Sequence, residues 1–474
     1  QNEIFDELDY AKDKRLNYHD RHDDYITRGY DQHFQEWGES DLIRTVLRDR
    51  NHPSVVQWSI GNEIEWTYLH YRYVTGFWTD PDDPQNTGAY WRSPPMYSPE
   101  ELKKRYEESE KGEYILTETA EKVNGWIKEL DTSRPTTANL VIPHISMVSG
   151  YADAVDLVGY SYRNIEIPWA AKHFPETQVS IHECPGSWDD WKYVLEYPGV
   201  YSIFMWTGIG YIGESDGKWP EKSGWGDMLD IAGFKNQGWN YFKSVFKDEA
   251  HISLGTLPLE KSGFQVDKYT GQAQARNNGS YTWRGSNMHW NYQEGDSILV
   301  EVCSNHSTVE LFLNGRSLGY RSMSESQDRL MRWIVPYEDG TLTARAGFKG
   351  AEVTAELNTA SDPQTFTLSS DKTSLKADAY DVAHLVVQLL DEKGHPVKTQ
   401  NREIHFEVEG DARILGVDTG APDNTQDFQS DRIKTDQGRC LLILQSTHQG
   451  GKVKVTAHSR GLDSQSVTLN IEKN

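Results

Sequence analysis

Cysteine is scarce in this chain, whose 474 residues contain only Cys184, Cys303 and Cys440. Their odd number and wide spacing indicate neither a disulfide framework nor a zinc site. Because free cysteine is among the residue types most often buried, we expect three buried thiols. The cysteine count leaves the cellular compartment open.

Long apolar runs are missing as well. No stretch approaches the roughly 18 consecutive apolar residues that mark a transmembrane helix, so we expect no membrane span. Basic residues are outnumbered, with 48 Lys and Arg against 72 Asp and Glu, for a net charge of −24. Binding nucleic-acid phosphates needs a basic surface, so we expect no nucleic-acid partner. The same charge disfavours polyanionic substrates through long-range repulsion, a field that Lys or Arg inside a pocket could overcome.

Aromatic rings, by contrast, are abundant, with 16 Trp and 25 Tyr. Such rings stack on the apolar faces of pyranose sugars, but they also fill protein cores. Composition alone therefore favours a carbohydrate ligand only slightly. The length predicts two to four domains.

The first 250 residues alternate helical and strand-like segments. Apolar residues recur with helical spacing within 20–50 and 113–130. Short apolar segments predict strands at 55–60, 135–140, 154–160, 178–181 and 200–207. Strands separated by helices form a parallel sheet with crossover connections. We therefore predict an α/β fold, a portion of a (β/α)8-type barrel, over residues 1–250.

After residue 250 the pattern changes to short strands without helical spacing between them. Asn314-Gly315 lies between two apolar segments and predicts a type I′ hairpin turn, and residues 361–363 read as a boundary. We predict two immunoglobulin-like antiparallel β-sandwiches, over 251–361 and 362–474. Neither carries a recognisable catalytic motif, so a spacer role and auxiliary sugar binding both stay open.

The most informative segment covers residues 51–63 and reads Asn-His-Pro-Ser-Val-Val-Gln-Trp-Ser-Ile-Gly-Asn-Glu. Its β-branched and aromatic residues between Pro53 and Gly61 predict a buried strand that ends in Asn62 and Glu63. A second apolar strand ends in Glu183, after which Pro-Gly breaks the chain into a loop. The C-terminal ends of parallel strands are where barrel enzymes hold their catalytic groups.

The 51–63 segment resembles the acid/base motif of glycoside hydrolase family 2, which includes β-galactosidases, β-mannosidases and β-glucuronidases. The resemblance implies that Glu63 is the general acid/base at the end of the fourth barrel strand. It also implies that Glu183 is the nucleophile at the end of the seventh. In a retaining pair the two carboxyl groups lie about 5–5.5 Å apart. Burial and the second carboxylate would keep Glu63 protonated while Glu183 stays ionised.

The resemblance also implies residues that bind the sugar. Asn62 resembles the family Asn that hydrogen-bonds the 2-hydroxyl of the sugar. Tyr162, at the end of Gly-Tyr-Ser-Tyr, resembles the Tyr that holds the nucleophile, although Ser161 replaces the usual Asn. Removing that Asn puts one hydrogen bond to the sugar in doubt. A core role for Tyr162 stays open.

The segment 204–214 resembles the eighth strand of the family and the loop that follows it. Trp206 matches a Trp in the floor of the sugar site, although it could equally be a core residue. The usual Phe-Asp after Trp-Thr-Gly is Ile209-Gly210 here, which removes a carboxylate that could anchor a sugar hydroxyl. Glu214 is a candidate replacement, or a solvated carboxylate. Galactose specificity is therefore less secure than glycosidase activity.

An insertion rich in rings separates Glu63 from the helical segment at 113. Its prolines and aspartates predict a loop. Long loops on the catalytic face of a barrel usually shape the pocket, so we interpret this one as a wall of the substrate site that includes Trp66. The alternative is a loop that packs on its own domain. The rings are Trp66, Tyr68, Tyr71, Tyr73, Phe77, Trp78, Tyr90, Trp91 and Tyr97.

Residues 3–7 resemble the family segment just after the third barrel strand. We therefore expect the first three strands and the upstream domains of the family to be missing from this chain. Since an incomplete barrel exposes sheet edges, either a complementary chain supplies that part or the sequence is a fragment of a longer folded chain.

The resemblance implies a retaining exo-β-glycosidase, most similar to β-galactosidases, that acts on an oligosaccharide by a mechanism that requires no metal or cofactor. Structural cations, which some family members bind, stay open. β-Mannosidase stays an alternative. β-Glucuronidase is a weaker one, because no convincing Asn-x-Lys motif is found. From another class, the chain could be a non-catalytic carbohydrate-binding or scaffold protein with an incomplete barrel.

Overall fold

The computed structural model describes residues 1–11, 29–78, 89–213, 215, 219–224, 228–276, 285–348 and 351–473. They form two compact units, Gln1–Trp206 and Thr207–Asn474. The predicted barrel range of 1–250 extends beyond the first unit, and the predicted domain ranges stay predictions. Within the described part of the chain, no helix combines the length and the apolar character needed to cross a membrane.

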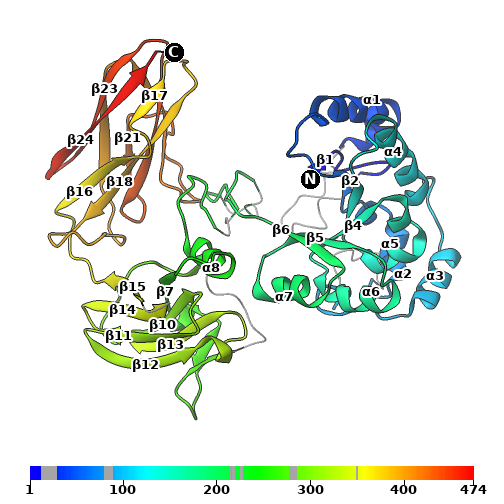
Figure 1. The fold of residues 1–474 in the computed structure, drawn as a ribbon, viewed down its shortest axis with the longest axis horizontal. Helices are drawn as coiled ribbons and strands as arrows, with labels where there is room; N and C mark the ends of the chain where they lie inside the picture. Colours follow the sequence, from blue (N-terminus) through cyan, green and yellow to red (C-terminus); the bar gives the residue numbers. More distant parts are fainter. Residues whose placement is uncertain are drawn as a thin grey trace. The chain divides into compact units, whose positions relative to one another are not determined.

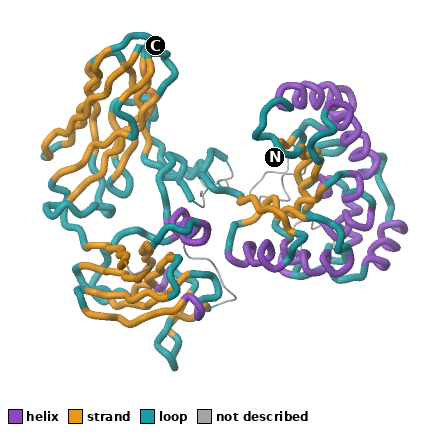
Figure 2. The backbone as a smooth tube through the Cα atoms, in the orientation of Figure 1, coloured by secondary structure: helices purple, strands orange, loops and turns teal. Residues whose placement is uncertain are grey.

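The first unit is built on one sheet of six parallel strands in sequential order. The strands are β1 (Asn2–Glu3), β2 (Trp58–Asn62), β3 (Thr136–Leu140), β4 (Leu157–Ser161), β5 (Val179–Cys184) and β6 (Val200–Met205). Parallel neighbours need crossover connections, and helices supply them. The helices lie along the outer side of the curved sheet (Figures 1 and 2). This arrangement confirms the predicted barrel-type sheet.

The helices of the first unit begin and end at recognisable signals. Helix α3 (Pro99–Glu108) starts with Pro99 after Ser98, whose side chain accepts a hydrogen bond from the Glu101 N–H. Helix α4 (Leu116–Leu130) buries a stripe with helical spacing. The remaining helices are α1 (Asp31–Asp49), α2 (Leu69–Val74), α5 (Pro143–Ser149), α6 (Ile167–His173) and α7 (Trp188–Glu196).

Two predicted strands start later than expected. The strand predicted at 55–60 is β2, which begins at Trp58 because 52–55 forms a turn with a hydrogen bond from Val55 N to His52 O. The strand predicted at 154–160 is β4, since 152–154 forms a short 3₁₀ helix. Glu3, which the family resemblance placed just after a strand, itself belongs to β1, in which Asn2 pairs with Trp58 and Glu3 with Ser59.

The insertion after Glu63 is not wholly a loop, which corrects the prediction. It contains the 3₁₀ helices η2 (Ile64–Thr67) and η3 (Tyr90–Arg92) and helix α2. Its aspartates and two of its prolines, Pro81 and Pro84, lie in residues 79–88, outside the described residues, whereas Pro94 and Pro95 lie in the described part. The aromatic residues around them bury enough surface to support short helices.

The second unit contains helix α8 (Gln237–Phe246) and two β-sandwiches, as predicted. The first sandwich packs β13-β10-β7 against β12-β11-β14-β15, and a small β8-β9 ladder lies beside it. Its strands are β7 (Ile252–Pro258), β8 (Phe264–Val266), β9 (Ala273–Ala275), β10 (Ser297–Ser304), β11 (Thr308–Leu313), β12 (Arg316–Ser322), β13 (Leu330–Pro336), β14 (Thr341–Phe348) and β15 (Ala351–Asn358). Asn314 and Gly315 both have positive φ, which confirms the predicted hairpin.

The second sandwich packs β16-β18-β22-β20 against β17-β24-β23-β19-β21. All its neighbouring strands are antiparallel except the β17–β24 pair. Its strands are β16 (Thr365–Ser370), β17 (Ser374–Lys376), β18 (Val382–Leu390), β19 (Glu403–Glu409), β20 (Ala412–Asp418), β21 (Arg432–Lys434), β22 (Arg439–Ser446), β23 (Gly451–Ser459) and β24 (Leu462–Glu472). All three cysteines of the chain are free and buried, as predicted.

Candidate active site

Five predicted site residues lie at the same edge of the parallel sheet. Asn62 ends β2 and Glu63 follows it, while Tyr162 and Trp206 directly follow β4 and β6. Glu183 lies one residue before the end of β5 and opposite Ser161 in the register. Because the strands are parallel, their carboxyl ends gather these side chains at one rim.

Glu63 is held in a tight turn as it leaves the sheet. Its backbone is left-handed, with φ 49° and ψ 38°, and its N–H donates to the Asn139 carbonyl at 2.9 Å. The chain folds back so closely that a Cβ on Gly61 would lie 2.6 Å from the Ile64 side chain. Glycine at 61 therefore permits the turn that places the buried Glu63 side chain.

Glu183 is held through its backbone by the neighbouring strand ends. Tyr162 N–H donates to the Glu183 carbonyl at 2.7 Å, and Trp206 N–H donates to the Cys184 carbonyl at 2.9 Å. Tyr162 has φ 55°, a second left-handed non-glycine residue at this rim. The side chains of Tyr162 and Trp206 are exposed, while Glu183 is half-buried.

A row of polar side chains crosses the sheet beneath this rim; Ser59, Asn139 and His182 are buried, whereas Asn62 is half-buried and Glu3 is exposed. Asn139 Nδ2 donates to Glu3 Oε2 at 2.8 Å and to Asn62 Oδ1 at 3.2 Å. Ser59 Oγ donates to the same Glu3 oxygen at 3.0 Å. His182 Nδ1 hydrogen-bonds Asn139 Oδ1. The row links residues on β1, β2, β3 and β5, so it ties the strand that carries Glu183 to the strand that carries Asn62.

His182 reaches Asn139 by crossing over β4. A Cβ on Gly159 would lie 1.8 Å from His182 Nδ1, so only glycine leaves room for the imidazole. Burial lowers the pKa of His182 to about 3, which keeps the ring neutral. Because the Asn139 amide donates to the Glu3 carboxylate, its oxygen faces His182, and we infer that the imidazole proton is on Nδ1.

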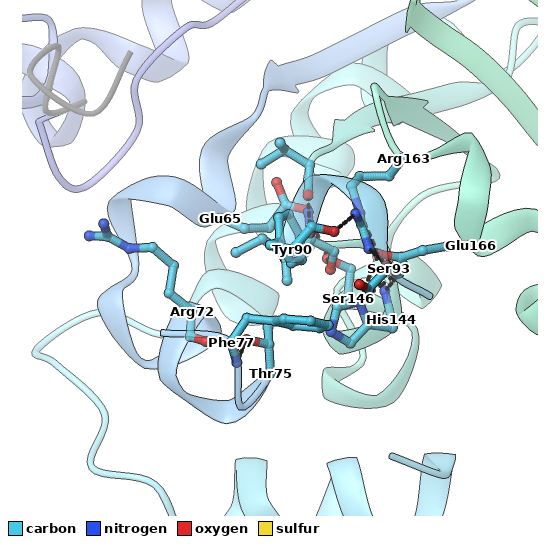
Figure 3. A network of polar contacts seen from close by, with 12 residues as sticks. Glu65, Arg72, Thr75, Phe77, Tyr90, Ser93, His144, Ser146, Arg163 and Glu166 are labelled. Atoms are coloured by element: carbon cyan, nitrogen blue, oxygen red, sulfur yellow. Dashed lines mark hydrogen bonds and ion pairs between the residues drawn. The ribbon is translucent and has the colours of Figure 1, made fainter. Parts of the chain in front are cut away.

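A fully buried ionic cluster lies next to β4 (Figure 3). Glu166 accepts from Arg163 Nε at 2.7 Å and from His144 N at 3.0 Å, and it lies 2.9 Å from His144 Nδ1. Burial by itself would raise the pKa of Glu166, but His144 and Arg163 outweigh it and hold that pKa below its ordinary value. The cluster fixes Arg163, the residue after Tyr162.

Glu65, two residues beyond Glu63, faces the protein interior. Its Oε1 accepts from Ile142 N at 3.2 Å and from Ser146 Oγ at 2.9 Å (Figure 3). Complete burial raises the pKa of Glu65 to about 7. Both donors belong to the start of helix α5, so Glu65 connects the turn after β2 to the segment after β3.

The rings of the insertion are mostly buried. Trp66 is 5% exposed, and its ring centroid lies 5.5 Å from that of Trp78 and 5.8 Å from that of Trp91. Tyr90 is fully buried, whereas Trp91 is 40% exposed. The insertion thus packs largely on its own domain and presents Trp91 to the surface. The substrate role of Trp66 stays a prediction, and Glu214 lies outside the described residues.

Sequence reasoning missed Glu3, Asn139, His182, Arg163 and Glu166. Each pairs with residues on other strands or loops, which no local spacing reveals. One signal was available, since Asn139 and His182 are polar residues inside short segments that otherwise read as buried strands.

Comparisons with known proteins match three parts of the chain. Residues 12–79 match the "Glycosyl hydrolases family 2, TIM barrel domain" and residues 366–468 match the "Glycoside hydrolase family 2 C-terminal domain 5". Residues 295–354 match a domain of unknown function. The family domains thus flank the first sandwich.

Two curated relatives cover most of the chain. The β-galactosidase BoGH2A of Bacteroides ovatus is 29% identical over 94% of this chain and 52% of its own length. A putative β-glucuronidase of Formosa agariphila is 24% identical over 84% of this chain and 37% of its own length. The chain therefore spans about half the length, or less, of these curated relatives.

Solved structures agree with the observed fold. A glycosyl hydrolase family 2 member from Bacteroides cellulosilyticus matches 99% of this chain and 54% of its own, with a TM-score of 0.76 and 27% identity. A β-glycosidase from Bacteroides vulgatus matches 98% of this chain and 56% of its own, with a TM-score of 0.69 and 21% identity, which is a likeness of fold. Family domains match both ends of the chain, a relative aligns along almost all of it, and the fold is shared with solved members. The chain therefore belongs to glycoside hydrolase family 2.

Proposed function

We propose that the protein is a retaining exo-β-glycosidase, β-galactosidase-like, which removes a terminal β-linked sugar from an oligosaccharide. Glu183 is the nucleophile and Glu63 the general acid/base. The observation that carries this proposal is the position of both carboxylates at the carboxyl rim of one parallel sheet. Two carboxyl groups across a glycosidic bond are the usual requirement for its hydrolysis.

The reaction proceeds in two displacements. The Glu183 carboxylate attacks the anomeric carbon, the bond to the leaving oxygen breaks, and that oxygen takes the proton of Glu63. Glu63 then removes a proton from water, whose oxygen attacks the same carbon and releases Glu183. Two inversions restore the β-configuration. The left-handed turn at Glu63 and the hydrogen bond from Tyr162 to the Glu183 backbone support this assignment, because both fix strand ends against motion.

The remaining predicted residues take part in binding. Asn62 binds the 2-hydroxyl and is oriented by the hydrogen bond from Asn139. Tyr162 and Trp206 are exposed at the rim and form part of the sugar-binding surface. Glu214 and Trp66 complete the proposed set. Of these, Trp66 acts from behind the surface, because its ring is buried against Trp78 and Trp91.

The sugar is the finer part of the proposal. Galactose is supported by the name of the β-galactosidase relative, and glucuronic acid by the names of the Formosa agariphila relatives. The net charge of −24 disfavours an anionic sugar, which places galactose first.

A panel of nitrophenyl β-glycosides, assayed with the complete natural protein, tests the activity and the sugar. We expect turnover of the β-galactoside, and faster turnover of the β-glucuronide would reassign the sugar. Absence of turnover with retained sugar binding would favour the non-catalytic alternative.

The nucleophile is tested by trapping. A 2-deoxy-2-fluoro glycoside of the preferred sugar slows the second displacement, so it should leave a covalent adduct on the peptide that contains Glu183, detected by mass spectrometry. Glu183→Gln should lower kcat by at least about 10³-fold. An adduct on another residue would reject the assignment.

A further inference from the structure

Arg163 holds the turn that carries Trp91. Its Nη1 donates to the Tyr90 carbonyl and its Nη2 donates to the Ser93 carbonyl at 3.0 Å (Figure 3). Its guanidinium also lies 3.8 Å from the centroid of the Tyr90 ring. These contacts bind the backbone on both sides of Trp91, and the buried Glu166 balances the charge. One buried side chain therefore sets the path of η3.

The same turn is attached on its other side to the segment after Glu63. Tyr90 Oη donates to the Val141 carbonyl at 2.5 Å, and the Trp91 ring packs on Trp66. Burial raises the pKa of Tyr90 well above its ordinary value, and the charges of Glu166, Glu65 and Glu63 add to that rise. Val141 directly follows β3 and Trp66 lies three residues after Glu63, so these two contacts hold η3 over the same strand ends as the candidate acid/base.

Of these tryptophan rings, Trp91 is the one that the packing leaves exposed to solvent. It is 40% exposed, whereas Trp66 is 5% and Trp78 is 3% exposed. A general acid must lie on the side of the leaving group, because it protonates the leaving oxygen. The Trp91 ring packs on Trp66 in the segment that directly follows Glu63, so it is held on the side of the candidate acid, where a leaving group would lie. Pockets for small molecules commonly use such aromatic surfaces.

We propose that Trp91 is the stacking platform for the sugar on the leaving-group side of the cleaved bond, and that Arg163 is the positioning residue that fixes it there. The ligand is a pyranose ring of the oligosaccharide substrate, whose apolar face lies on the indole. This inference rests on the proposed glycosidase function and adds to it a binding site for a second sugar.

The test compares leaving groups of different size on the same sugar. The complete natural protein and its Trp91→Ala variant are assayed for kcat/KM with a disaccharide and with the β-glycosyl fluoride. Fluoride has no ring to stack, so its kcat/KM should stay within about twofold. The disaccharide should lose about tenfold, which corresponds to about 1.4 kcal/mol and lies within the range of one aromatic contact. Trp91→Phe should recover most of the loss.

Trp37→Ala is the matched control, since Trp37 lies on helix α1 and is 45% exposed. It should leave both substrates unchanged. Equal losses on both substrates in Trp91→Ala, or no loss on either, would overturn the platform while leaving the proposed function standing. No turnover of any substrate by the unaltered protein would overturn the proposed function and this inference together.

Arg163→Lys tests the positioning role. Lysine keeps a positive charge beside Glu166, but a single ammonium cannot reproduce the planar fork that reaches both carbonyls. We expect the disaccharide to lose kcat/KM several-fold more than the fluoride does, and transfer to a sugar acceptor to fall relative to hydrolysis. A uniform loss for both substrates would mean that Arg163 supports the fold alone. If the variant does not fold, Trp91→Ala still decides the platform.

Discussion

At the residue scale, the candidate site is built on strained backbone. Glu63 and Tyr162 both adopt left-handed conformations that cost non-glycine residues about 1–3 kcal/mol each. Such conformations persist only where surrounding contacts determine them, and here the hydrogen bonds to Asn139 and Glu183 do so. Among the described residues of the first unit, Glu63 and Tyr162 are the non-glycine residues with positive φ, and both lie at the rim that carries the candidate carboxylates.

Gly159, which lies on β4 three residues before Tyr162, shows the same requirement for a close fit. We predict that Gly159→Ala lowers the free energy of unfolding by about 1–3 kcal/mol and lowers kcat, because the new Cβ would collide with the His182 ring next to Glu183. Urea denaturation and steady-state kinetics measure the two effects. Adding His182→Ala should restore part of the stability, since it removes the collision partner.

Gly125→Ala is a control that should change the free energy of unfolding in the opposite direction. Gly125 lies inside helix α4, and a Cβ there meets nothing within 4 Å. Alanine should therefore stabilise the protein by about 0.5–1 kcal/mol and leave kcat unchanged. A destabilisation as large as that of Gly159→Ala would show that glycine replacement, rather than the His182 contact, causes the loss.

At the element scale, helix α7 directly supports the loop that leaves β5 after Glu183. Ser187 and Asp190 form a reciprocal capping box, and Asp190 Oδ1 also accepts from Asn164 Nδ2 at 2.6 Å. The cap thus joins the end of β5 to the segment after β4. Both segments emerge at the candidate site, so the helix start fixes part of its frame.

We predict that Ser187→Ala lowers the free energy of unfolding by about 1 kcal/mol, because the Asp190 N–H loses its side-chain acceptor at the helix start. Ser187→Thr should retain most of the stability, since threonine also caps. Urea denaturation of the two variants gives the comparison. Equal losses in both would indicate that the serine is needed for its size rather than for its hydroxyl.

The sequence predicted most elements of this region but not its contacts. The apolar spacing of 113–130 and the motif of 51–63 predicted α4, β2 and the place of Glu63. The Asn139–His182 and His144–Glu166 pairs could not be predicted, because they form only after the strands are assembled. The helices in the insertion were missed since burial of aromatic rings outweighed the local signals of a loop.

At the scale of the whole molecule, the second sandwich has a contact that its sequence does not reveal. Within the second unit, the segment after β6 reaches β22, where Arg439 Nη2 lies 3.0 Å from Asp230 Oδ2. A Cβ on Gly420 would lie 2.3 Å from the same carboxylate oxygen, so the fit is close. The two partners are 209 residues apart, beyond the reach of any local pattern. The second sandwich thus holds the segment that follows Trp206 in the chain. This contact gives the sandwich a structural role in addition to the spacer role that the sequence left open.

This contact makes a prediction about pH. Burial raises the pKa of Asp230 to about 6 although Arg439 lowers it, while an unfolded Asp titrates near 3.9. The folded state therefore binds more protons between about pH 4 and 6, so this group's contribution to stability falls as pH rises through that window.

Arg439→Met removes the lowering charge, so the pKa of Asp230 should rise further and the fall should extend to higher pH. We expect a loss of about 1–3 kcal/mol at pH 8 and a smaller loss at pH 5, measured by urea denaturation. Adding Asp230→Asn to Arg439→Met should remove the pH dependence of the loss, because no carboxylate is left unpaired. A loss from Arg439→Met that is the same at both pH values would instead assign the contact to the packing of Arg439 on Phe234, whose ring centroid lies 4.2 Å from the guanidinium.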